Sequence, residues 1–205
     1  MSPRPAIDHI RKPQILRAAA EVITERGLGA TRIADVAERA GTSAPAVLYW
    51  FESREHLLTE ALIADESAFA DELNAELDSL GTARERLLAV LERTVSDGDL
   101  SLWIELWARS LHDPDSSAER RRLDLAWRGR IATIVREGQE GGEFEPALDP
   151  DAFAVEFAAL IDGLGVQVTL GDPDVSAERM LDLLVQVADL QLATSLRGSL
   201  EGAVG

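Results

Sequence analysis

The chain has 205 residues, 46% of them hydrophobic, which is enough for one large domain or for a small domain joined to a larger one. It contains no cysteine, and this excludes disulfides, thiolate zinc sites and a cysteine nucleophile. Its formal net charge of −17 argues, as an average, against a nucleic-acid partner, because phosphate neutralisation normally supplies much of the affinity for DNA.

The chain lacks the common signals for secretion, membrane insertion and catalysis. The start, MSPRPAIDHIRKPQ, has no apolar core of the signal-peptide kind, and no apolar run approaches the roughly 20 residues that span a bilayer. There is no Gly-rich phosphate loop, no G-x-S-x-G and no H-E-x-x-H, and the three histidines lie far apart. We therefore expect a cytoplasmic protein with no membrane partner, which is not an enzyme and holds no metal or cofactor.

The charge is uneven along the chain. Residues 1–64 hold eight basic and eight acidic side chains, whereas residues 65–205 hold twelve arginines and twenty-nine acidic residues. A neutral segment can approach a polyanion that would repel the acidic remainder, so the sequence predicts two separate functions in one chain.

Helical patterns begin near the N-terminus. Apolar residues recur at i, i+3, i+4 and i+7 in PQILRAAAEVITERG and again in TRIADVAERAG. The first helix should have Pro13 in its first turn and end at Gly27. The second should be capped by Thr31 and end at Gly41.

The second and third helices have the spacing of a helix-turn-helix. Ala37 is small enough for two helices to cross closely, and Gly41 allows the turn between them. The third helix, in TSAPAVLYWF, should be capped by Ser43 with Pro45 in its first turn. In such a motif the second helix presents its N-terminal residues to base edges in a major groove about 12 Å wide.

Three adjacent aromatic residues end the third helix. Phe51 and Val47 are four residues apart and can pack inward on the first helix, which leaves Tyr49 and Trp50 facing solvent or DNA. Two exposed aromatic side chains indicate a partner. The alternatives are a plain three-helix packing unit with ordinary surface residues, or a module that uses these aromatics to bind another protein.

The remaining segments are also helical in pattern. A helix capped by Ser53 should run without Gly or Pro to about Leu77, long enough to link two parts of the molecule as a rigid rod. Further helices are expected at about 83–97, 100–112, 115–139, 150–170 and 176–196, separated by breaks rich in Gly, Pro and Asp. The prediction is an all-α protein of about nine helices.

Residues 15–58, ILRAAAEVITERGLGATRIADVAERAGTSAPAVLYWFESREHLL, resemble the N-terminal DNA-binding domain of the TetR family of repressors. The resemblance implies a helix-turn-helix domain at 1–58 and a helical ligand-binding and dimerisation domain at 59–205. It implies a homodimer that binds a palindromic operator and is released by a small-molecule effector in the C-terminal domain. The DNA contacts carried over by position, with their neighbours, are Thr31, Arg32, Thr42, Ser43, Ala44, Pro45, Ala46, Tyr49, Trp50 and Arg54.

The chain departs from the family pattern at three points. Arg54 replaces a lysine and should serve a phosphate equally well. Leu48 stands where a tyrosine is usual, and Ala44 and Ala46 replace polar residues. Base readout should therefore depend more on methyl contacts and DNA shape than on hydrogen bonds.

The C-terminal part is similar to the domain of the betaine-regulator type of TetR protein, on LWIELWARSLHDPD and on the stretch from GEFEPALDP to RMLDLL. In such proteins the last two long helices pair with those of a second subunit. Gly163 and Gly165 fit that role because small residues let helices approach closely, and the alternative is close packing within the subunit.

Aromatic residues of this part suggest an effector site. Trp103 and Trp107 are four residues apart on one helical face, and such pairs are usually plain core. If they line a cavity instead, aromatic walls suit an apolar compound or, with a carboxylate, an organic cation. The alternative for Glu105 and Asp162 is a solvated or helix-capping role. The candidate ligand-binding residues are Trp103, Glu105, Trp107, His112, Trp127, Phe157 and Asp162.

The expected mechanism is control of transcription, most simply repression, with the helix that ends near Leu77 acting as the lever. The recognition helices of a dimer must enter half-sites about 34–36 Å apart, so a small rotation would unseat one of them. An enzyme would need convergent titratable groups, for which the sequence offers no motif.

Overall fold

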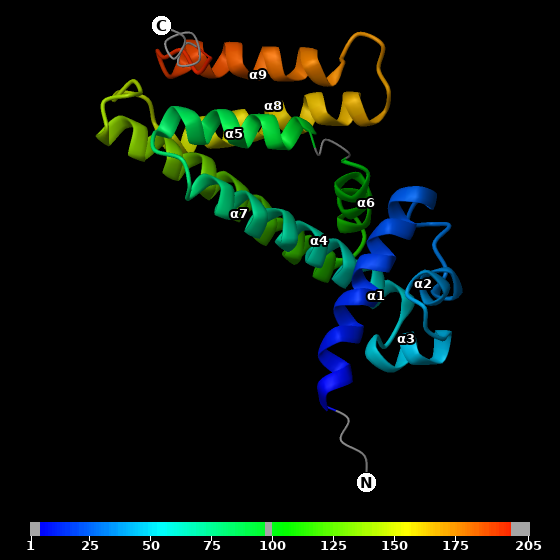
Figure 1. Ribbon diagram of the computed structural model, residues 1–205. Helices are drawn as coiled ribbons and strands as arrows, with labels where there is room; N and C mark the ends of the chain where they lie inside the picture. Colours follow the sequence, from blue (N-terminus) through cyan, green and yellow to red (C-terminus); the bar gives the residue numbers. More distant parts are fainter. Residues whose placement is uncertain (1–4, 97–99, 198–205) are drawn as a thin grey trace, which may run out of the picture. The chain divides into compact units, whose positions relative to one another are not determined.

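The computed structural model describes residues 5–96 and 100–197, with side chains from Lys12 onward (Figure 1). Nine α-helices and no strand lie within these residues, as the sequence predicts. The chain divides into two compact units, residues 1–70 with 101–120 and residues 71–100 with 121–205. The first unit thus includes a stretch that follows the predicted boundary at residue 58 and a second one that begins at residue 101.

The first unit contains α1 (Pro5–Arg26), α2 (Ile33–Arg39), α3 (Ala44–Trp50), the first part of α4 (Arg54–Leu77), α6 (Ser101–Ser110) and the start of α7 (Pro114–Glu140). Helix α1 packs against both α2 and α6. The interior of this first unit is apolar, with Ile23, Val36, Leu58 and Leu106 all buried. The packing of α6 on α1 therefore gives the N-terminal helices a neighbour from much later in the chain.

Two sequence predictions about helix starts are wrong. Helix α1 begins at Pro5, so Pro13 lies inside it, since a proline removes one backbone hydrogen bond without forbidding helical turns before it. Helix α2 is capped at Arg32, whose backbone N–H donates to the Asp35 carboxylate at 3.2 Å. Thr31 instead donates its hydroxyl to the Gly27 carbonyl at 2.9 Å.

The helix-turn-helix is formed by α2 and α3. Gly41 has a φ of +63°, which favours glycine, and the N–H of Thr42 donates to the Ala37 carbonyl at 2.8 Å. Ser43 caps α3 by accepting from the Ala46 N–H at 3.3 Å, and Pro45 lies in the first turn. These local features confirm the predicted motif.

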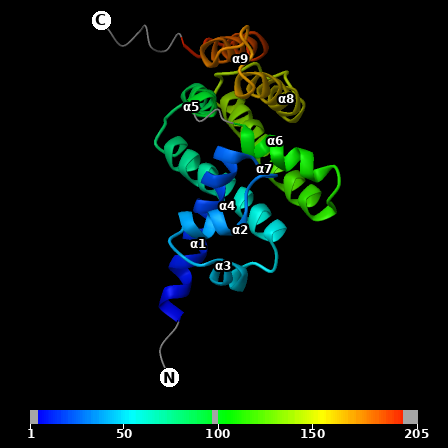
Figure 2. The same cartoon turned by 90° about the vertical axis from the view of Figure 1, so that its right-hand side faces the viewer.

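The second unit contains the rest of α4 and α7 with α5 (Ala83–Ser96), α8 (Pro150–Thr169) and α9 (Ala177–Gln191). Asp149 caps α8 and Ser176 caps α9. Helix α9 packs on both α5 and α8, and Figure 2 shows α8 and α9 side by side. The core includes the stacked rings of Phe153 and Phe157, whose centroids are 4.9 Å apart.

The two glycines of α8 have different surroundings. A Cβ atom on Gly165 would lie 2.5 Å from Cδ1 of Leu100, whereas nothing lies within 4 Å of one on Gly163. Gly165 therefore serves close packing within the unit, which corrects its predicted place in a subunit interface. Gly163 is exposed and stays available for that role.

Helix α8 is, among the described residues, the one helix long and apolar enough by composition to cross a membrane. The sequence alone predicts no membrane-spanning helix, because Glu156 and Asp162 interrupt the apolar run of α8. The core helix of a soluble protein passes the same test, and Phe153, Phe157 and Ile161 are buried within the second unit.

Candidate DNA-binding and effector-binding sites

Helix α3 presents a mixed aromatic and small-residue surface. Tyr49 is 80% exposed, Trp50 is half-buried, and the two rings meet edge to face with centroids 5.4 Å apart. Phe51 and Val47 are fully buried, which confirms the predicted division of this helix. Large apolar side chains in solvent are unusual enough on a small helix to indicate a contact surface.

The leading end of α3 is open to a partner. Ser43 and Pro45 are exposed, and the predicted contact residues Thr42, Ala44 and Ala46 are half-buried. No bulky side chain stands at these five positions, so another surface can come close to the helix backbone.

Basic side chains of the first unit are mostly paired. Lys12 lies 2.9 Å from Glu60, and Arg26 lies 2.8 Å from Asp35. Arg39 pairs with two glutamates of α1. Arg32 is exposed, with no ion pair among the described residues, so its charge is free to meet a phosphate.

Arg54 and Thr31 are engaged inside the unit. Arg54 donates through Nε to the Thr31 carbonyl at 2.7 Å and through Nη2 to the Leu28 carbonyl. The Thr31 side chain is only 1% exposed. Arg54 thus links α4 to the loop after α1, since the guanidinium has several donors that match backbone carbonyls.

Two tryptophans of α6 lie together, and one of them reaches a carboxyl group of α4. The rings of Trp103 and Trp107 are 5.9 Å apart, and the Trp103 indole hydrogen-bonds the Glu66 side chain on α4. Burial raises the pKa of Glu66 to about 8, the nearby charge of Asp65 adds to this rise, and the Trp103 hydrogen bond opposes it. Removing water and adding a negative neighbour both disfavour a charged carboxylate.

The sequence prediction missed Glu66. It lies four residues after Leu62 and three before Phe69, so it interrupts the apolar stripe of α4. A lone carboxyl on such a stripe was the available signal.

The structure separates the other predicted effector residues of the first unit from this cluster. Glu105 accepts through Oε1 from the Leu28 N–H at 3.0 Å. His112 is exposed in the turn after α6. Neither is therefore grouped with the two tryptophans.

The second unit holds the remaining predicted effector residues. Asp162 on α8 has its pKa raised to about 6 by burial and by the charge of Asp124, while Arg128 opposes the rise. The Arg130 guanidinium lies 5.8 Å from the Trp127 ring centroid. Phe157 is a core residue stacked on Phe153, because it fills the interior of the unit.

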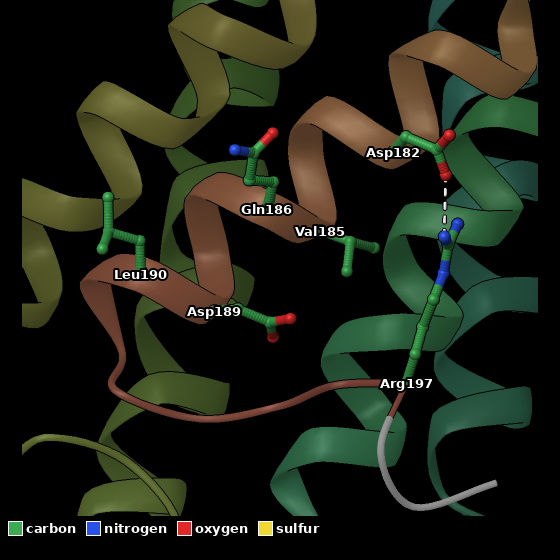
Figure 3. Close-up of a pocket in the computed structure, with 6 residues that line it drawn as sticks. All are labelled: Asp182, Val185, Gln186, Asp189, Leu190 and Arg197. Atoms are coloured by element: carbon green, nitrogen blue, oxygen red, sulfur yellow. Dashed lines mark hydrogen bonds and ion pairs between the residues drawn. The ribbon is translucent and has the colours of Figure 1, made fainter. Parts of the chain in front are cut away.

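A surface groove runs along α9 (Figure 3). It is lined by Asp182, Val185, Gln186, Asp189, Leu190 and Arg197. Arg197 pairs with Asp182 at 2.7 Å across it. None of the predicted effector residues lines this groove, and within the described residues no cluster of His, Asp and Glu could hold a metal ion.

The sequence matches two family profiles. Residues 15–61 match the family described as bacterial regulatory proteins, tetR family. Residues 83–193 match the C-terminal domain of the BetI-type transcriptional repressor. The HTH-type transcriptional regulator BetI of Escherichia coli (strain K12) is 28% identical over 184 residues, which cover 86% of this chain and 91% of that protein.

Solved structures agree with these matches. A transcriptional regulator from Saccharomonospora viridis, in complex with choline, is 32% identical with a TM-score of 0.82, over 88% of this chain and 96% of that chain. A TetR-family regulator from a Rhodococcus species is 30% identical with a TM-score of 0.72, over 89% of this chain and 98% of that chain.

Proposed function

Because the chain belongs to the TetR family of transcriptional regulators and carries a BetI-type C-terminal domain, we propose that it binds a palindromic operator as a homodimer and is released by a choline-like organic cation. It is a regulator and not an enzyme. The family is one of bacterial DNA-binding proteins, which supports the cytoplasmic location expected from the sequence.

The proposed DNA surface is the exposed side of α3 with Arg32. Tyr49 is the main support for this surface, since an 80% exposed aromatic side chain with a hydroxyl at its tip can reach a phosphate or a base edge. Thr42, Ser43, Ala44, Pro45, Ala46 and Trp50 complete the surface. The side chains of Thr31 and Arg54 are left out of it, because they already serve hydrogen bonds inside the unit.

The proposed effector contacts in the first unit are Trp103, Trp107 and Glu66. A quaternary ammonium has no N–H donors, so it is recognised by ring faces and by a negative charge. The choline in the Saccharomonospora viridis relative has this chemistry. In the second unit we propose Trp127 and Asp162 as residues to test, since an indole and a carboxyl group are the kinds of side chain that recognise such a cation.

The proposed dimer surface lies on α8 and α9. Val155, Ala159 and Gly163 are exposed at four-residue spacing on α8, and Leu190 of α9 is also exposed. Exposed apolar and small residues in a row let two helices pack closely.

The test is fluorescence anisotropy of the purified protein with labelled DNA from upstream of its own gene, at two salt concentrations, with and without choline. We expect saturable binding that weakens steeply with salt and is reduced by choline. Tyr49→Ala should weaken binding by about 1–3 kcal/mol, roughly 5- to 150-fold, if the side chain reads a base or phosphate.

The matched control is Leu111→Ala, which removes an equally exposed large side chain from the turn after α6. Equal losses in both variants would contradict the proposed surface. Failure to bind any sequence in a random-sequence selection would instead favour a protein partner, with its weak salt dependence.

A further inference from the structure

The loop between α1 and α2 is held through both backbone polar groups of one residue, Leu28. The N–H of Leu28 donates to Glu105 of α6 at 3.0 Å, and the Leu28 carbonyl accepts from Arg54 of α4. Arg54 also binds the Thr31 carbonyl at 2.7 Å, where the loop enters α2. We call Glu105 and Arg54 the loop clamp, and both belong to the first unit.

Helix α6 has two faces with different tasks. Residues are about 100° apart around a helix, so Glu105 points about 200° away from Trp103 and from Trp107. Arg109, one turn after Glu105, donates to the Glu55 carbonyl in the first turn of α4 at 3.2 Å. One face of α6 therefore contacts the loop before α2 and the first turn of α4, while the other carries the tryptophan pair.

The loop is connected to the recognition helix α3 through α2. It enters α2 at Ile33, and α2 passes through the Gly41 turn into α3. A Cβ atom on Gly27 would lie 3.4 Å from Glu105 Oε1, so the carboxylate sits close against the backbone here. A small turn of α6 would withdraw the carboxylate from the Leu28 N–H and leave the loop held by Arg54 alone, so that α2 and α3 could shift.

We propose that Glu105 couples the effector face of α6 to the recognition helix by holding the Leu28 N–H in the DNA-binding conformation. This inference rests on the proposed function. An effector that binds better when α6 has turned releases the operator, because only differential affinity for two states can shift an equilibrium. Glu105 is thus a positioning residue and not an effector contact.

The test compares the full-length wild type with Glu105→Ala, Glu105→Gln and Glu76→Gln. Glutamine keeps an acceptor oxygen for the Leu28 N–H, whereas alanine removes it. Glu76→Gln removes an exposed charge from α4 whose side chain makes no hydrogen bond or ion pair among the described residues, and it serves as the control. Three quantities are measured: operator affinity with and without choline, choline affinity by calorimetry, and hydrogen exchange of the Leu28 amide.

In the wild type and the control we expect choline to lower operator affinity by about 5- to 150-fold, the usual size of such coupling. In Glu105→Ala this ratio should fall to about twofold while choline still binds, and the Leu28 amide should exchange faster. Glu105→Gln should retain part of the ratio. A merely structural role would lower the melting temperature without changing the ratio, and a full ratio in Glu105→Ala would overturn the proposal.

Failure of the proposed function gives a different result. If the wild type binds its operator but choline has no effect, choline is not the effector, and the clamp is judged on Leu28 hydrogen exchange and on operator affinity without choline. Faster Leu28 exchange with an operator affinity changed at least about fivefold in Glu105→Ala would then support it. Unchanged exchange and unchanged affinity would overturn it.

Discussion

At the scale of single residues, Glu66 is the most unusual group in the described part of the first unit. Its carboxyl group is held beside Trp103 and near Asp65, with a pKa of about 8. Near neutral pH it is therefore mostly protonated. A cation that pairs with it must displace the proton first, so the two binding events are linked.

Choline affinity should accordingly rise with pH. Below pH 8 the dissociation constant should fall by up to about tenfold for each pH unit, because one proton leaves for each cation bound, and it should level off above pH 8. Calorimetry from pH 6 to 9 checks this. Glu66→Gln should bind more weakly at high pH and lose the dependence; an unchanged slope in that variant would assign the titration to another group, such as Asp162.

The same raised pKa affects stability. The folded state binds the Glu66 proton more tightly than the unfolded state between the ordinary pKa of 4.5 and about 8, so the free energy of unfolding falls as pH rises through this window. The difference in melting temperature between Glu66→Gln and wild type should therefore grow in favour of the variant from pH 5 to pH 8.5. A constant difference would mean that the carboxyl group titrates alike in both states.

At the scale of elements, α8 shows how two glycines two residues apart can have opposite tasks. Gly165 faces Leu100 and Met180 within the second unit, whereas Gly163 faces open space. Glycine lowers helix stability relative to alanine by about 1 kcal/mol, so alanine should be favourable wherever its methyl group has room.

Gly165→Ala should lower the free energy of unfolding by about 1–3 kcal/mol, because its methyl group overlaps Leu100 in a packed interior. Gly163→Ala should leave it unchanged or raise it by up to about 1 kcal/mol. Urea denaturation of the two variants checks the pair. Equal changes in the free energy of unfolding in the two variants would contradict the different surroundings of the two glycines.

At the scale of the whole molecule, the proposed function requires two copies of the chain. A single α3 of seven residues offers few hydrogen-bond donors, so we expect affinity for the proposed palindrome to come from two recognition helices acting together. The acidic remainder of the chain also repels DNA, which leaves the operator to the neutral N-terminal segment.

Light scattering should therefore find a dimer, and Val155→Asp should weaken it by adding a like charge on both sides of the α8 surface. Operator binding should fall with it, whereas Leu111→Asp, an exposed change in the first unit, should leave the dimer intact. A dimer unaffected by Val155→Asp would move the interface elsewhere.

The sequence by itself determined the features that depend on neighbouring residues. Helix caps at Ser43 and Ser53, the turn at Gly41 and the inward side of α3 all follow from local spacing, and the structure confirms them. The family and the regulator class came from the motif between Ile15 and Leu58, because it holds the helix-turn-helix in one contiguous stretch.

Only the tertiary structure decided which polar groups meet. Glu105 and Leu28 are 77 residues apart, and Arg54 reaches carbonyls more than 20 residues earlier. A side chain near a predicted site has the same sequence signature whether it faces a ligand or a backbone amide. The fold chooses between these because a buried N–H or carbonyl must find a partner, and the closest suitable side chain supplies it.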